Sequence, residues 1–192
     1  GINAKEKLEQ AREDLCALLS VPKETITFTG GASEANAIVF NSLVWRLQKP
    51  HVIISNIEHS SITEYVRLMK QLGWKVTTIN APGGFIKRED LRKALTKQTR
   101  LVSLMLVNNV VGTIQDIQAL VEEVRTYEKE QGGRKIHFHT DATQALGKIP
   151  FSLESLGVDS AAFSAHKFHG PKGVGFLYNI DPAIESLSRG GG

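Results

Sequence analysis

Apolar residues recur along the chain with two alternating periods, one typical of helices and one typical of short buried strands. Leucine and alanine residues at spacings of three and four predict an amphipathic helix over residues 4–20. A short β-branched run follows at residues 26–29, and the period then keeps switching along the chain. The pattern therefore predicts helices and strands in alternation over the whole length.

The alternation sets the expected fold class. The predicted helices cover residues 4–20, 33–47, 62–72, 88–95 and 116–130. The predicted strands cover residues 26–29, 52–55, 75–79, 101–107, 136–139, 160–163 and 174–178. The segment 101–107 is almost continuously apolar, as expected of a strand buried on both faces. We predict an α/β fold of three αβα layers around a mostly parallel sheet.

Polar motifs directly follow several of the predicted strands, at residues 29–33, 56–60, 108–109, 140–144 and 164–167. In a parallel sheet the carboxyl ends of the strands meet at one edge, where ligand sites gather. We therefore expect these motifs to form a single site.

Composition narrows the class of protein. Of 192 residues, 41% are hydrophobic and 22% charged, which is typical of one globular domain or a large piece of one. The net charge of +3 and the absence of a basic run argue against a nucleic-acid partner. No apolar stretch approaches the roughly 20 residues that span a bilayer, and the polar N-terminus does not resemble a signal peptide.

Cys16 is the single cysteine, which excludes an internal disulfide and fits a reducing compartment. We expect a soluble, cytoplasmic protein with no membrane partner. The chain begins at a helix and stops at a glycine triplet with no closing element, so we also expect a fragment of a longer protein.

The glycine turn at Gly30 and Gly31 lies between a predicted strand and a predicted helix. Glycines permit a tight turn there, and the free N–H groups of a helix start attract a phosphate. The simpler interpretation is that Ser33 is only an N-cap.

Histidines offer two further candidates. His59, after the strand at 52–55, could stack on an aromatic ring or carry protons, although a loop histidine is commonly just exposed. His137 and His139 share one strand face and could suggest a metal pair. No third ligand has suitable spacing, so we predict ordinary strand residues and no metal site.

Asp141 and Lys167 complete the candidate set. A carboxylate such as Asp141 can keep a pyridine nitrogen protonated, with Gln144 near the ring hydroxyl, or it can be a capping residue. Lys167 could form a Schiff base if positive charge and partial burial lower its pKa, or it could be an exposed lysine. An aldehyde, a ring nitrogen and a phosphate together indicate pyridoxal 5′-phosphate.

In order, these motifs resemble the class V aminotransferase family of fold-type I pyridoxal-phosphate enzymes, particularly the cysteine desulfurase group and selenocysteine lyase. The matching segments span the chain and lie at residues 28–34, 58–59, 107–112, 139–144 and 164–173. The resemblance implies that Lys167 and His59 are catalytic and that pyridoxal 5′-phosphate is the cofactor. It implies a cofactor-binding set of Ala32, Ser33, His59, Asn109, Asp141, Gln144, Ser164, His166 and Lys167.

Within that set, the resemblance assigns Asp141 to the ring nitrogen and His59 to the ring face. It assigns Gln144 and Asn109 to the ring hydroxyl and the substrate side, with Asn108 the weaker candidate of the asparagine pair. The phosphate cup would comprise Ala32, Ser33, Ser164 and His166.

The chain departs from the family pattern in three ways. Val110 stands where relatives usually have glutamate, so local polar contacts are expected to differ. The family's first strand is absent, and so is its C-terminal small domain with the mobile catalytic cysteine and the substrate-carboxylate arginine. We therefore expect residues 1–192 to be the central part of the large domain, with Cys16 no substitute for the missing cysteine.

The resemblance implies a cysteine desulfurase that converts L-cysteine to alanine and a protein persulfide. It also implies a homodimer when the protein is intact and allows a sulfur-acceptor protein as partner. Two alternatives stay open: selenocysteine lyase or another class V enzyme acting on a small amino acid, and an inactive scaffold domain without cofactor.

Overall fold

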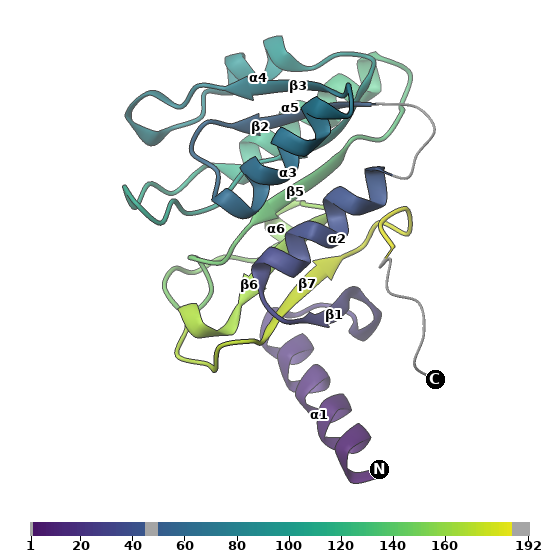
Figure 1. Ribbon diagram of the computed structural model, residues 1–192, viewed down its shortest axis with the longest axis vertical. Coiled ribbons are helices and arrows are strands. Elements are labelled where there is room, and N and C mark those ends of the chain that lie inside the picture. The colour runs from purple at the N-terminus through teal and green to yellow at the C-terminus, as the bar shows by residue number, and fades with distance from the viewer. Residues whose placement is uncertain (1, 45–49, 186–192) are drawn as a thin grey trace.

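The protein is described here by a computed structural model that covers residues 2–44 and 50–185 (Figure 1). A seven-stranded sheet carries helices on both faces. The predicted three-layer α/β architecture is confirmed. The end of the helix predicted over 33–47 falls at residues 45–47, outside the described residues.

The elements agree closely with the predicted ranges. The helices are α1 (Ile2–Leu19), α2 (Ala32–Val44), α3 (Ser60–Gln71), α4 (Arg88–Ala94), α5 (Ile117–Glu130) and α6 (Leu153–Leu156). Short 3-10 turns are η1 (Lys23–Thr25), η2 (Pro82–Gly84) and η3 (Ala165–Lys167). The strands are β1 (Ile26–Thr29), β2 (His51–Ser55), β3 (Lys75–Ile79), β4 (Thr99–Ser103), β5 (His137–Asp141), β6 (Ser160–Ser164) and β7 (Gly175–Asn179).

The sheet has the strand order β1-β7-β6-β5-β4-β2-β3. β7 runs antiparallel to both of its neighbours, and every other neighbouring pair is parallel. All strands except β7 therefore point the same way. This topology brings the carboxyl ends of β1, β2, β4, β5 and β6 to one edge of the sheet.

β4 is shorter than its apolar run predicts, because it ends at Ser103 rather than at residue 107. The following backbone still hydrogen-bonds toward β5, with Leu104 N donating to His139 O at 3.1 Å and Leu106 N donating to Asp141 O at 3.0 Å. Val107 then pairs with Ile114 in an isolated antiparallel bridge. The apolar run therefore indicates which residues are buried, whereas the extended strand ends before the run does.

The two faces of the sheet have separate cores. One cluster joins the sheet to α4, α5 and α6, and the other joins it to α2 and α3. Side chains alternate along β5, so Phe138 enters the first cluster while His139 contacts Asn36 of α2 on the other face. Truncating a fully buried residue such as Phe138 to alanine should cost about 3–5 kcal/mol.

Within the described residues, no helix has both the length and the apolarity required to cross a bilayer.

Candidate cofactor-binding site

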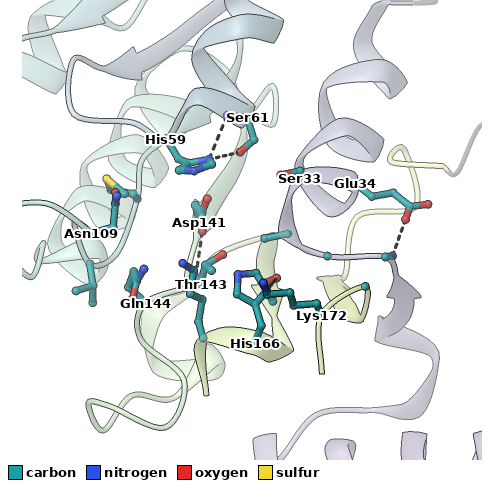
Figure 2. A pocket seen from close by; sticks show the side chains of 18 residues that line it. Ser33, Glu34, His59, Ser61, Asn109, Asp141, Thr143, Gln144, His166 and Lys172 are labelled. Atoms are coloured by element: carbon teal, nitrogen blue, oxygen red, sulfur yellow. Dashed lines mark hydrogen bonds between the residues drawn. The ribbon is translucent and has the colours of Figure 1, made fainter. Parts of the chain in front are cut away.

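A cavity of about 520 Å³ lies at the edge of the sheet where the parallel strands end (Figure 2). Residues that end or follow β1, β2, β4, β5 and β6 contribute to its lining. The lining contains every residue predicted to bind a cofactor: Ala32, Ser33, His59, Asn109, Asp141, Gln144, Ser164, His166 and Lys167. The motifs that follow the strands do therefore meet at one place.

Asp141 ends β5 and is only 5% exposed. Its Oδ1 accepts a hydrogen bond from the Thr143 N–H at 3.0 Å, and its Oδ2 accepts one from Asn36 Nδ2 at 3.2 Å. These donors fix the orientation of the carboxylate. A buried carboxylate so held at the cavity wall can accept a hydrogen bond from a protonated ring nitrogen.

His59 is the N-cap of α3. Its Nδ1 accepts a hydrogen bond from the Ser61 N–H at 3.1 Å and lies 2.9 Å from Ser61 Oγ. Because Nδ1 is the acceptor, the neutral imidazole carries its proton on Nε2. His59 therefore brings a defined tautomer to the cavity lining, and its ring is exposed enough to contact a bound aromatic group.

The glycine turn presents the start of α2 to the cavity. Gly31 C=O accepts the first helical hydrogen bond, from Ala35 N at 3.1 Å, so Gly31 is the N-cap. Ser33 lies in the first turn, and its interpretation as the N-cap is wrong. The N–H groups of Ala32 and Ser33 have no acceptor within the helix, because they belong to its first turn. Such free N–H groups favour the binding of an anion. The Gly30 N–H instead donates to Glu34 Oε2 at 2.6 Å.

Lys167 lies in η3, directly after β6. The loop is closed by Gly170 N donating to Ala165 O at 2.9 Å and by Ala165 N donating to Val174 O at 3.0 Å. Lys167 is exposed, so the expected partial burial of this lysine is wrong for the chain as described. Lys172 also lines the cavity, which gives it a second flexible cation.

Ser164 and His166 flank the same turn, and Ser164 Oγ lies 3.0 Å from His166 Nδ1. The hydroxyl and the imidazole thus form a joined polar pair opposite the start of α2. Gly31 lies close by, because a Cβ added to it would stand 3.4 Å from Ser164 Oγ. The three residues enclose a polar end of the cavity.

The asparagine pair divides between loop structure and cavity lining. Asn108 is buried, and its Oδ1 accepts from Val110 N at 2.8 Å and from Val111 N at 2.9 Å. Asn109 is exposed and lines the cavity. Val110 is 82% exposed and does not belong to this lining.

The structure adds residues that the sequence did not single out. Thr143 and Ser61 line the cavity, and Asn36 lies beneath Asp141. A signal for Asn36 was present, because it is a polar residue on the apolar, buried stripe of α2 formed with Ala35 and Val39. Gln144 is where we predicted, and its Oε1 accepts a hydrogen bond from Lys148 Nζ.

Two other predicted features lie elsewhere. Cys16 is buried in α1, where burial raises the pKa of its thiol, and it is not part of the cavity lining. His137 and His139 are buried strand residues that hydrogen-bond to neighbouring side chains. Within residues 2–44 and 50–185, no group of three or more metal-ligating side chains is found.

Comparison with known proteins gives consistent matches over the chain. The Aminotransferase class-V family model matches residues 1–192. The cysteine desulfurase IscS of Dictyoglomus turgidum is 38% identical over 98% of this chain and 48% of its own length. The chain thus spans about half the length of the curated relatives it matches.

Solved structures agree with the sequence relatives. A NifS-like protein superimposes with a TM-score of 0.92 at 39% identity, covering 100% of this chain and 52% of that one. A C-DES variant with glycine covalently linked to its pyridoxal-phosphate cofactor has a TM-score of 0.82 at 25% identity, covering 92% of this chain and 46% of that one. With the family match over its full length and a shared fold, this chain belongs to the class-V aminotransferase family.

Proposed function

We propose that this chain is the central, cofactor-binding part of the large domain of a pyridoxal 5′-phosphate-dependent cysteine desulfurase. The intact enzyme removes sulfur from L-cysteine and gives alanine and a protein persulfide. The observation that carries the proposal is the meeting of Lys167, Asp141 and the start of α2 around one cavity. The relatives named cysteine desulfurase support the choice of substrate.

The residues of the cavity fit the cofactor. Thr143 Oγ1 is buried and has no hydrogen-bond partner among the described residues, as expected of a group reserved for a ligand. The start of α2 and two lysines, Lys167 and Lys172, match the charge of a phosphate. Asp141 matches a ring nitrogen, and the volume of about 520 Å³ accommodates a small aromatic ligand.

We assign each of these lining residues a role toward the cofactor. Lys167 Nζ would hold it covalently, Asp141 would bind its ring nitrogen, and His59 would pack on its ring. Ala32, Ser33, Ser164 and His166 would hold the phosphate, while Gln144 and Asn109 would contact the ring hydroxyl and the substrate side. When bound, pyridoxal 5′-phosphate supplies an aldehyde that captures amines and a ring that accepts electrons.

Proton transfer is the chemistry left to the protein. Lys167 and His59 each bring a nitrogen atom to the cavity lining that can accept or donate a proton. His59 holds its proton at Nε2, because its Nδ1 is engaged by Ser61. We infer that Lys167 removes the substrate proton and that His59 assists.

The sulfur acceptor comes from outside the described residues. Cys16 is buried in α1 and separate from the cavity, so it does not receive the sulfur. We propose that another segment of the intact protein supplies the acceptor cysteine, that the intact protein is a cytoplasmic homodimer, and that a separate acceptor protein takes the persulfide.

The proposal is tested by trapping the cofactor on the intact protein. After addition of pyridoxal 5′-phosphate and borohydride reduction, mass spectrometry should place the adduct on Lys167. Lys167→Ala should abolish both the adduct and the absorbance band of the lysine-linked cofactor. Lys172→Ala is the matched variant from the same cavity, and the adduct should still form at Lys167.

Each alternative gives a distinct result. An adduct on Lys172, or a band of lysine-linked cofactor that survives Lys167→Ala, would contradict the assignment of Lys167. Failure of the intact protein to bind the cofactor would favour an inactive scaffold. If the intact enzyme releases selenide from L-selenocysteine faster than sulfur from L-cysteine, its assigned activity changes from cysteine desulfurase to selenocysteine lyase.

A further inference from the structure

A chain of buried hydrogen bonds runs from Asp141 along β5, beneath α2, to the far end of the strand. It joins the side chains of five buried residues to Asp141: Asn36, His139, Ser160, His137 and Asp181. The residues of β5 share a face because side chains two apart along a strand point the same way. α2 contributes Asn36, β6 contributes Ser160, and the loop after β7 contributes Asp181.

Every link has ordinary hydrogen-bond length. Asn36 Nδ2 lies 3.2 Å from Asp141 Oδ2, and Asn36 Oδ1 lies 2.9 Å from His139 Nε2. His139 Nδ1 lies 2.7 Å from Ser160 Oγ, which lies 2.7 Å from His137 Nε2. His137 Nδ1 lies 2.8 Å from Asp181 Oδ2 and ends the chain.

The direction of the first links follows from the chemistry of Asp141. A carboxylate only accepts, so Asn36 must donate through Nδ2 and accept through Oδ1. His139 therefore carries a proton on Nε2. Burial, with a smaller contribution from His137, lowers the pKa of His139 to about 3, so the ring is neutral and Nδ1 is bare. That nitrogen accepts the only O–H of Ser160.

The direction of the remaining links follows from Asp181. The O–H of Ser160 already donates its hydrogen bond to His139, so the Ser160 oxygen must accept one from His137 Nε2. The carboxylate of Asp181 must accept from His137 Nδ1. His137 therefore carries both protons and forms an ion pair with Asp181, whose pKa is lowered chiefly by this hydrogen bond. Lys135 lies at 4.0 Å from Asp181 and adds positive charge at this end.

Asn36 also has a branch toward the second functional residue. Its Nδ2 donates to Ser61 Oγ at 2.9 Å, and Ser61 Oγ lies 2.9 Å from His59 Nδ1. If the Asn36 amide were flipped, its oxygen would face the Asp141 carboxylate, and two acceptors would then meet. The observed orientation of the amide, with Oδ1 toward His139 and Nδ2 toward Asp141, is therefore fixed. One amide group thus orients both Asp141 and His59.

We propose that Asn36 and His139 are positioning residues that hold the Asp141 carboxylate and the His59 tautomer in place, with the His137–Asp181 ion pair anchoring the other end of the chain. The inference rests on the proposed function, because it gives Asp141 and His59 their roles toward the cofactor. The hydrogen-bond directions themselves belong to this chain and need no cofactor.

The directions can be tested in the cofactor-free intact protein. Nitrogen-15 NMR of the imidazoles at neutral pH should show His139 with a protonated Nε2 and a bare Nδ1, and His137 with both nitrogens protonated. A His139 protonated on Nδ1, or a neutral His137, would overturn the proposed chain. This result does not depend on cofactor binding.

The positioning role can be tested with two substitutions of His139, each of which keeps a polar atom at the position of only one ring nitrogen. In His139→Gln, the amide nitrogen takes the place of Nε2 and can still donate to Asn36. In His139→Asn, the amide reaches only the Nδ1 position and Asn36 loses its donor. We expect His139→Asn to weaken cofactor binding by about tenfold and to shift the pH dependence of its absorbance, while His139→Gln restores most of the affinity.

Ser103→Ala is the matched control. Ser103 pairs with His139 across β4 and β5, and its buried hydroxyl has no hydrogen-bond partner among the described side chains and backbone. The substitution removes a buried oxygen next to His139 without removing a link. Equal cofactor affinity in all three variants would reject the positioning role while leaving the proposed function intact. If the unaltered protein binds no cofactor, the proposed function fails. The NMR result then still shows whether the proposed hydrogen-bond directions are correct.

Discussion

At the scale of single residues, the least expected group beside the cavity is the carboxyl of Glu58, directly after β2. Oε1 accepts hydrogen bonds from Ser55 Oγ and, at 3.1 Å, from Met105 N, whereas Oε2 is buried and has no partner in the part of the chain that the structure describes. Burial raises the pKa of Glu58 to about 8, with Asp141 adding to the shift. The side chain is therefore a neutral acid at neutral pH that ties β2 to the segment after β4.

This assignment predicts different outcomes for two substitutions at neutral pH. Glu58→Gln keeps the accepting oxygen and the neutral state, so the free energy of unfolding should change by less than about 1 kcal/mol. Glu58→Ala leaves Met105 N and Ser55 Oγ without their acceptor and should cost about 2–3 kcal/mol. Urea denaturation of both variants measures the difference, and equal losses would show that Glu58 is charged at neutral pH.

Sequence reasoning identified the residues whose position follows from strand order. Asp141 and Lys167 directly follow buried strands, and parallel strands end at one edge, so their meeting was predictable. The partners of these residues were not. Asn36 lies 105 positions from Asp141, and Glu58 lies 47 positions from Met105. Such pairs depend on how α2 and the loops pack, which no local pattern contains.

At the scale of elements, β7 alone among the strands of the described residues opposes the direction of its neighbours, and its approach to the turn before α2 depends on Gly175. A Cβ on Gly175 would lie 2.4 Å from Phe163 O and 2.5 Å from Gly31 Cα. Both atoms belong to the backbone and cannot move aside as a flexible side chain would. The absence of a side chain at Gly175 therefore lets β7 support the turn that begins α2.

Gly175→Ala should therefore impair both stability and cofactor binding. Overpacking against backbone should cost about 1–3 kcal/mol, and displacement of Gly31 should weaken phosphate binding at α2. Gly133→Ala is the control, since it has positive φ but no atom within 4 Å of an added Cβ. It should lower stability by about 1–2 kcal/mol through strain alone. Its cofactor affinity, measured by absorbance titration, should stay unchanged. Equal affinities for both variants would contradict the role of Gly175 in supporting the turn before α2.

The elements themselves were largely predictable, and the exceptions have local causes. α2 and α5 have long apolar periods, and both were predicted close to their observed starts. α6 was missed because its four residues are too short to display a period, although Ser152 caps its start and Gly157 its end. β4 was predicted too long because residues after Ser103 stay buried while their backbone leaves the strand.

At the scale of the whole molecule, two buried groups oppose each other in the pH dependence of stability. His139 is neutral when folded, with its pKa lowered from 6.5 to about 3, so its stabilisation is lost as the pH falls below 6.5. Glu58 is neutral when folded, with its pKa raised from 4.5 to about 8, so its stabilisation is lost as the pH rises above 4.5. Between pH 4.5 and 6.5 the two effects cancel.

Glu58 and His139 together should therefore add no net slope to the free energy of unfolding between pH 4.5 and 6.5, and each should lower stability on its own side of that range. Above pH 6.5, Glu58 contributes a slope of up to about 1.4 kcal/mol per pH unit. Glu58→Gln cannot ionise and should reduce the slope of this alkaline limb. It should leave the acid limb, to which His139, His51 and Asp181 contribute through their lowered pKa values. Glu64→Gln, a change at an exposed glutamate, should leave both limbs in place. Urea midpoints measured across the pH range provide the test, because an alkaline slope that is unchanged in Glu58→Gln would assign this limb to another group.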